Sequence, residues 1–252
     1  MLVMRPPRWK IFEFFDIPVY VDVSFLVLLF LFLNSGGSFS YGLMQAMVLG
    51  LSIVAHEYGH ALTGRIFGCE THDINLSMIG GCASMLSMPR RGGQEFLVAI
   101  AGPLVSFVLC GTGYLALLIL PIENHFLAYT LAYLYWLNLA LGCFNLLPGF
   151  PMDGGRIFRS VMMLFLSRPK ATFVAMWIGR VFAVLLGLSG LYSLFNGGSW
   201  AFIRIFIAWM IWKDGYREYQ LACREEDFRR WSQGDFNARV SPPPYDRQAD
   251  GI

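Results

Sequence analysis

Two histidines four positions apart, His56 and His60, flank Glu57 in an apolar stretch of the chain. Residues at this spacing lie on one face of a helix, so both imidazoles can reach a single ion. Imidazole nitrogens suit zinc, and a catalytic zinc site keeps one coordination position open for water. Glu57 lies beside that position and can take a proton from the water molecule. The segment therefore predicts a helix that carries a hydrolytic zinc site.

A third zinc ligand must come from elsewhere in the chain, because two histidines do not complete a hydrolytic site. Asp153 is the leading candidate. Residues that stop a helix or permit a close bend surround it, namely Pro148, Pro151, Gly154 and Gly155. Unwound backbone of this kind can turn the carboxylate towards the histidines. The alternative is that Asp153 only caps the helix that follows.

The surroundings of the histidines decide between a site and a merely structural role. In a soluble helix, His56 and His60 are readily explained as hydrogen-bonded core residues. In a membrane span that explanation weakens, because ionisable groups are costly there and are by default candidates for function. The composition favours a membrane: of 252 residues, 56% are hydrophobic and only 14% are charged.

Other classes of protein fit the composition poorly. A net charge of +2, without a basic stripe interleaved with aromatics, gives no reason to expect nucleic acid as a partner. The five cysteines are scattered and lack the close pairs of a thiolate zinc site or a disulfide framework. We interpret them as small apolar fillers.

Runs of apolar residues predict an all-α polytopic membrane protein with about six transmembrane helices. The predicted spans cover 19–33, 43–64, 96–120, 126–147, 173–195 and 200–212. Lysine and arginine collect in cytoplasmic loops, and in a six-span arrangement most of them fall on one side. The opposite loops, 34–42, 121–125 and 196–199, contain neither residue. Both termini are therefore expected in the cytoplasm.

Two segments do not fit simple helices. Apolar residues alternate with other types over 17–23, which is the pattern of a strand. Segment 71–88 holds Gly80 and Gly81 and is too apolar for an ordinary loop, so it predicts a small membrane-associated β-hairpin or sheet between the second and third spans. The expected organisation is a cytoplasmic segment at 1–16, a membrane domain at 17–212 and a charged cytoplasmic tail at 213–252 with a disordered end.

The two motifs resemble those of the site-2 protease family of intramembrane metalloproteases. Its His-Glu-x-x-His helix matches 56–60, and its later Asn-x-x-Pro-x-x-Pro-x-Asp-Gly segment matches 145–154. Weaker similarities at 80–83, 101–103 and 178–180 extend the resemblance over most of residues 14–212. The exported loops are short, as in compact bacterial and archaeal members that lack a PDZ or CBS domain.

The resemblance implies one zinc ion per chain, bound by His56, His60 and Asp153, with Glu57 as general base. It also implies that Asn145 lies near the oxyanion of the scissile carbonyl, whereas hydrogen bonding to carbonyls freed at a helix break is an equally weighted role for this residue. The expected substrates are transmembrane proteins, cleaved within or near their spans. A plasma membrane location follows by the same analogy.

Two other functions stay open at this point. An ion or metal transporter could use the same histidines and carboxylates together with Arg180 and Arg204 as a pathway, but no repeated halves are evident. An inactive membrane scaffold is the second alternative, against which the intact ligands and base argue. Nothing in the sequence predicts the oligomeric state.

Overall fold

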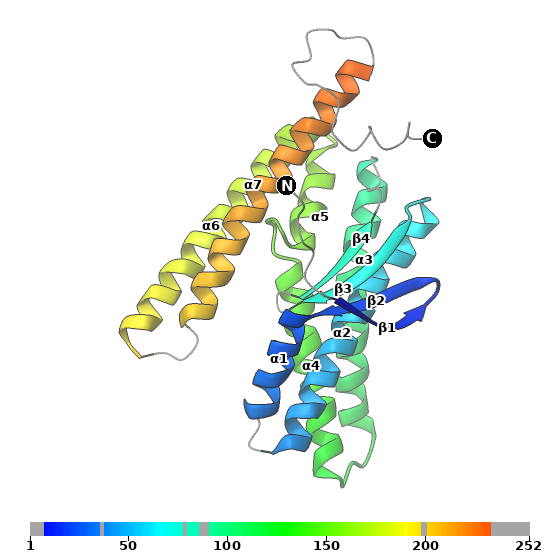
Figure 1. Ribbon diagram of the computed structural model, residues 1–252, viewed down its shortest axis with the longest axis vertical. Helices are drawn as coiled ribbons and strands as arrows, with labels where there is room; N and C mark the ends of the chain where they lie inside the picture. Colours follow the sequence, from blue (N-terminus) through cyan, green and yellow to red (C-terminus); the bar gives the residue numbers. More distant parts are fainter. Residues whose placement is uncertain (1–7, 36–37, 78–79, 86–90, 198–200, 233–252) are drawn as a thin grey trace. The chain divides into compact units, whose positions relative to one another are not determined.

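The computed structural model describes residues 8–35, 38–77, 80–85, 91–197 and 201–232 (Figure 1). Contacts divide the chain into two compact units, Met1–Leu146 and Leu147–Ile252. The division falls inside the membrane domain expected at 17–212. Each unit is described by itself.

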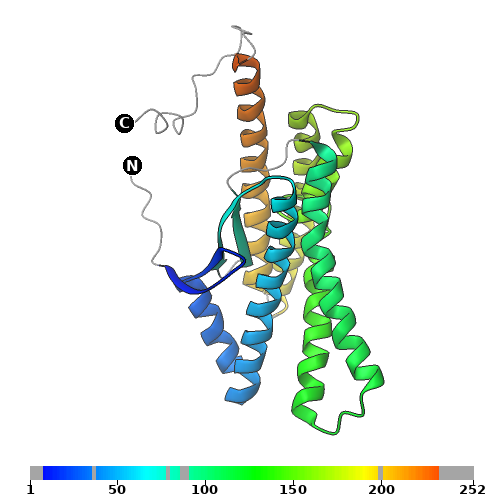
Figure 2. The same cartoon turned by 90° about the vertical axis from the view of Figure 1, so that its right-hand side faces the viewer.

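The first unit contains four helices: α1 (Val23–Ser35), α2 (Phe39–Ile66), α3 (Gly92–Ile119) and α4 (His125–Asn145). The helix α2 contacts α1, α3 and α4, so the segment with the histidines is the central element of this unit. Figure 2 shows α3 and α4 side by side, connected by a short turn. Asp22 begins α1 by accepting hydrogen bonds from the backbone N–H groups of Ser24 and Phe25.

A four-stranded sheet belongs to the same unit and has the order β1-β2-β3-β4 (Figure 1). Its strands are β1 (Arg8–Phe14), β2 (Ile17–Asp22), β3 (Thr71–Ser77) and β4 (Gly80–Met85). The pairs β1–β2 and β3–β4 are antiparallel, whereas β2 and β3 are parallel. Phe15 and Asp16 both have positive φ, which gives the tight two-residue turn between β1 and β2 its twist.

The sheet packs on α2 through one apolar face. Alternate residues of β2 are buried, and they form one core cluster with residues of β3 and α2. The cluster includes Ile17, Val19, Val21, Ile74, Leu76, Val54, Tyr58 and Ala61. Burial of this face fixes the strand register, because a slip by one residue would expose every one of these side chains.

The strand expected at 17–23 is present as β2, and β3 with β4 lies in the segment 71–88, of which 78–79 and 86–88 are outside the described residues. The strand β1 was not predicted. Its side chains are mostly exposed, so no buried face imposed a pattern of alternation on its sequence.

The second unit contains α5 (Asp153–Met162), α6 (Arg168–Phe195) and α7 (Ala201–Ser232). The helices α6 and α7 pack along each other as a hairpin (Figure 1). The span predicted at 200–212 is therefore the first part of a longer helix. The increase in charged residues after residue 212 does not end the helix, which continues to Ser232. The disorder predicted for the end of the tail concerns 233–252, outside the described residues.

Four of the described helices, α2, α3, α4 and α6, are long and apolar enough to cross a membrane. They correspond to the spans predicted at 43–64, 96–120, 126–147 and 173–195. The chain is thus a mainly helical membrane protein with a small sheet.

Candidate metal centre

The two histidines of α2 are buried and face each other. Each is only 4% exposed, and the Nε2 atoms of His56 and His60 lie 3.2 Å apart. Two ligands bound at 2.0–2.1 Å to one tetrahedral ion would be separated by about 3.3 Å. The spacing of the two nitrogens therefore fits a shared zinc ion.

Both imidazole rings are oriented by α3. The Nδ1 atom of His60 lies 2.7 Å from the carbonyl oxygen of Val98, and the Nδ1 atom of His56 lies 2.9 Å from the hydroxyl of Ser106. Because a carbonyl only accepts, the Nδ1 atom of His60 carries the proton and its Nε2 lone pair is left for a metal. Such outer contacts fix the ring and the tautomer of a metal-binding histidine.

Gly102 lets α3 approach the two metal-binding nitrogens. A Cβ atom at this position would lie 2.2 Å from Nε2 of His60 and 2.7 Å from Nε2 of His56. A second close approach occurs at Gly59 of α2, where a Cβ atom would lie 2.8 Å from the carbonyl oxygen of Ala101. Glycines on both facing helices therefore allow α2 and α3 to approach each other closely beside the histidines.

Glu57 is half-buried and follows His56 directly on α2. Side chains of the same helix also form hydrogen bonds with the backbone at the β1–β2 turn. The hydroxyl of Tyr58 lies 3.1 and 3.0 Å from the carbonyl oxygens of Phe14 and Ile17, and Arg65 donates to the carbonyl of Phe15 at 2.6 Å. These contacts hold the metal-binding helix against the β1–β2 turn.

Asp153 belongs to the second unit, where it is 7% exposed and is the first residue of α5. The unwound segment predicted around it therefore ends one residue earlier, at Met152. This segment packs tightly on α6, because a Cβ atom at Gly149 would lie 2.5 Å from the Cα atom of Gly179. Buried Phe150 lies under the guanidinium of Arg159, at 4.8 Å from the ring centre.

Asn145 is the last residue of α4, and its side-chain amide donates to the carbonyl of Leu141 at 3.1 Å. This is a contact of the helix end, one of the two roles expected for the residue. Within the first unit the structure thus brings His56, His60 and Glu57 together on α2. The supporting residues Val98, Gly102 and Ser106 were not predicted as part of the site, although 101–103 matched the resembling family.

Residues 44–128 and 120–188 match peptidase family M50. The chain belongs to this family. A site-2 protease of known structure from Methanocaldococcus jannaschii is similar to this M50 member with a TM-score of 0.63 and 31% sequence identity, over 84% of this chain and 95% of that one.

Two curated relatives have names that specify zinc. The zinc metalloprotease MJ0392 of Methanocaldococcus jannaschii is 34% identical over 73% of this chain and 54% of that protein. The putative zinc metalloprotease sll0528 of Synechocystis sp. is 33% identical over 92% of this chain and 65% of that protein. This M50 member thus spans about half to two thirds of the length of these relatives.

Family membership confirms the resemblance inferred from the two motifs. Together with the apolar helices, it makes this M50 member a multi-pass membrane protein. The two relatives named above and the matched structure are proteases by name, and none of the three is named as a transporter or a scaffold.

Proposed function

We propose that the chain is a zinc-dependent intramembrane endopeptidase that hydrolyses peptide bonds in or near the transmembrane segments of other proteins. The observation that carries this proposal is the pair of buried Nε2 atoms of His56 and His60, 3.2 Å apart beside a glycine.

Asp153 is proposed as the third zinc ligand. Two neutral imidazoles and one carboxylate are a donor set that suits catalytic zinc and leaves a position for water. Asp153 is buried in its own unit, and its carboxylate is the type of donor that the two imidazoles lack.

Zinc, when bound, supplies positive charge that polarises the scissile carbonyl and lowers the pKa of water. Glu57 accepts the proton of the attacking water and passes it to the leaving amine. The contacts to Val98 and Ser106 keep both imidazoles in one orientation. Asn145 is proposed to donate to the oxyanion that develops on the substrate, which requires its amide to leave the carbonyl of Leu141.

The proposed substrates are transmembrane proteins with helix-weakening residues near the cut. A helical backbone hides its carbonyls in hydrogen bonds, so the substrate must unwind before hydrolysis. The strand β4 stands at the edge of the sheet and offers backbone groups to an extended peptide. We propose that an unwound substrate adds to this edge.

Six spans with both termini in the cytoplasm are proposed for the topology. Because β2 and β3 pair in one sheet, they lie on the same side of the membrane, and the chain between them must cross an even number of times. Since α2 is long enough to cross, the shorter α1 must cross as well. The hairpin of α6 and α7 supplies the last pair of spans, in a plasma membrane, and residues 213–252 form a cytoplasmic tail.

The test compares purified wild-type protein with Glu57→Gln in lipid nanodiscs. Zinc per chain is measured by mass spectrometry of the metal, and cleavage is followed on a panel of single-span substrates. Stoichiometric zinc in both proteins, with cleavage by wild type alone, is the expected result. Removal of zinc by a chelator should abolish cleavage, and added zinc should restore it.

Asp153→Ala supplies a separate test of the third ligand. It should lose most of its zinc, whereas Asp214→Asn on α7 should keep it. Folded wild-type protein that holds no zinc and cleaves none of the panel would overturn the proposed function. Full zinc content in Asp153→Ala would overturn only the assignment of this ligand.

A further inference from the structure

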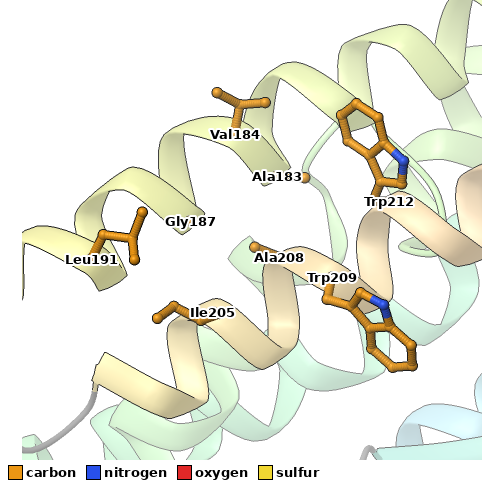
Figure 3. A pocket seen from close by; sticks show the side chains of 8 residues that line it. All are labelled: Ala183, Val184, Gly187, Leu191, Ile205, Ala208, Trp209 and Trp212. Carbon is orange, nitrogen blue, oxygen red and sulfur yellow. The ribbon is translucent and has the colours of Figure 1, made fainter. Parts of the chain in front are cut away.

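An apolar groove runs between α6 and α7. Figure 3 shows small residues on its floor and larger side chains along its sides. The lining is formed by Ala183, Val184, Gly187, Leu191, Ile205, Ala208, Trp209 and Trp212. It extends over residues 183–191 of α6 and 205–212 of α7. At a rise of 1.5 Å per residue this is about 10–12 Å. This length matches most of one bilayer leaflet, whose hydrocarbon is about 15 Å deep.

Two cations stand at the tryptophan end of the groove. The guanidinium of Arg180 lies 4.6 Å from the ring centre of Trp212, and the amine of Lys213 lies 5.0 Å from that of Trp209. Helical spacing places them in line with the groove, since Arg180 is four residues before Val184 and Lys213 is four residues after Trp209. The opposite end of the groove approaches the turn between the two helices.

Arg180 is a charge without a counter-ion in the described part of the chain. Three aromatic rings surround its guanidinium, those of Trp177, Trp212 and Tyr216. Its Nε atom is buried and has no hydrogen-bond partner among the described residues. An arginine in a predicted membrane span normally pairs with a carboxylate or another acceptor, so this site lacks an anion.

We propose that the groove binds one acyl chain of an anionic phospholipid and that Arg180 and Lys213 bind its phosphate. The apolar lining between the helices would contact the acyl chain, whereas the cations at the end of the groove would bind the negatively charged head group. Aromatic rings do not accept conventional hydrogen bonds from the guanidinium N–H groups. Phosphate oxygens accept such hydrogen bonds with good geometry. A lipid without net charge could place its acyl chain in the groove but would not neutralise the charges of Arg180 and Lys213.

The test is native mass spectrometry of the full, delipidated chain in detergent. Phosphatidylglycerol and phosphatidylcholine with identical acyl chains are titrated separately. Wild type should retain one phosphatidylglycerol at least fivefold more tightly than phosphatidylcholine. Arg180→Gln should remove this preference, and Arg180→Lys should restore part of it. Arg224→Gln is the matched control, because it removes the same charge from an exposed position of α7.

Two further measurements distinguish the contribution of the acyl chain to binding from that of the phosphate head group. Gly187→Leu fills the groove and should weaken both lipids about fivefold. Inorganic phosphate at equal concentration should not compete, because the acyl chain supplies part of the affinity. Equal binding of the two lipids, a retained preference in Arg180→Gln, unchanged binding in Gly187→Leu or competition by phosphate would each overturn the proposal. Zinc content and thermal unfolding of every variant verify that it is folded.

Discussion

The absence of a side chain at Gly102 is as important to the proposed centre as the imidazoles themselves. His56 and His60 point at α3, and their Nδ1 atoms are held by groups on that helix. The helix can come this close only because a glycine lies opposite the Nε2 atoms. An added methyl group would lie against both Nε2 atoms, on the side where a shared ion would bind.

Gly102→Ala should therefore lower the affinity for zinc by at least tenfold. The methyl carbon would lie 2.2 Å from Nε2 of His60, too close for any contact without displacement of a ring or a helix. Zinc content and zinc titration of the purified variant measure the effect.

Gly111→Ala on the same helix is the control, because nothing lies within 4 Å of the added Cβ atom. It should bind zinc as wild type does and gain up to about 1 kcal/mol from helix propensity. Stoichiometric, tight zinc in Gly102→Ala would show that the ion does not occupy the space beside this glycine.

For the individual residues of the centre, the sequence predicted the metal-binding helix but not the residues that surround it. The spacing of His56 and His60 is a local property, so it can be recognised without a fold. The contributions of Ser106, Gly102 and the Val98 carbonyl depend on how α3 packs against α2. Only the tertiary structure brings these residues beside the histidines.

Among the helices, α2 and α4 are connected by a buried polar contact. The amide of Asn138 donates to the hydroxyl of Ser52 at 2.9 Å and also lies 2.9 Å from the carbonyl oxygen of Leu134. Both side chains are buried, with Asn138 fully so. Such hydrogen bonds between membrane helices fix how the helices pack.

Ser52→Ala and Asn138→Ala should each destabilise the protein, and their effects should not be additive. The coupling free energy expected from comparable pairs is about 0.6 kcal/mol, with an upper bound of about 1.7 kcal/mol. A double-mutant cycle on the unfolding free energy in detergent measures it. Thr130→Val replaces Asn138→Ala in the control cycle, because Thr130 hydrogen-bonds within α4. Equal coupling in the two cycles would contradict a specific contact between α2 and α4.

The elements were predicted where burial imposed a pattern. The strand β2 alternates because one of its faces is buried on α2, whereas β1 is mostly exposed and its sequence carries no such signal. Likewise, composition marked the change after residue 212 but could not mark the end of α7, since charged residues such as Glu and Arg continue a helix well.

For the whole chain, the sheet constrains the path through the membrane. Runs of apolar residues predicted six spans from the sequence, whereas only four of the described helices are individually long and apolar enough to cross. The short α1 is about 20 Å long at 1.5 Å per residue, less than the hydrocarbon core. Its crossing is inferred from strand pairing, which neither composition nor length could supply.

Labelling of single cysteines should place the β1–β2 turn and the segment after α2 on one face of the membrane. Cysteines at Asp16 and Glu70, introduced into a protein with its native cysteines replaced, should react with an impermeant thiol reagent only from the cytoplasmic side. Cysteine at Glu123, between α3 and α4, should react only from the other side. Opposite reactivity of the first two positions would refute the even number of crossings between β2 and β3.

The parallel pairing of β2 with β3 also sets an order of assembly. The β1–β2 hairpin leaves the ribosome first, but its partner strand is synthesised only after α1 and α2. In the proposed six-span topology, the sheet can close only once both helices have entered the bilayer and the chain has returned to its starting side. Only then can Arg65, just before β3, join the hairpin turn. With this topology, the contacts of the metal-binding helix with the sheet would form only in chains in which α1 and α2 have both inserted.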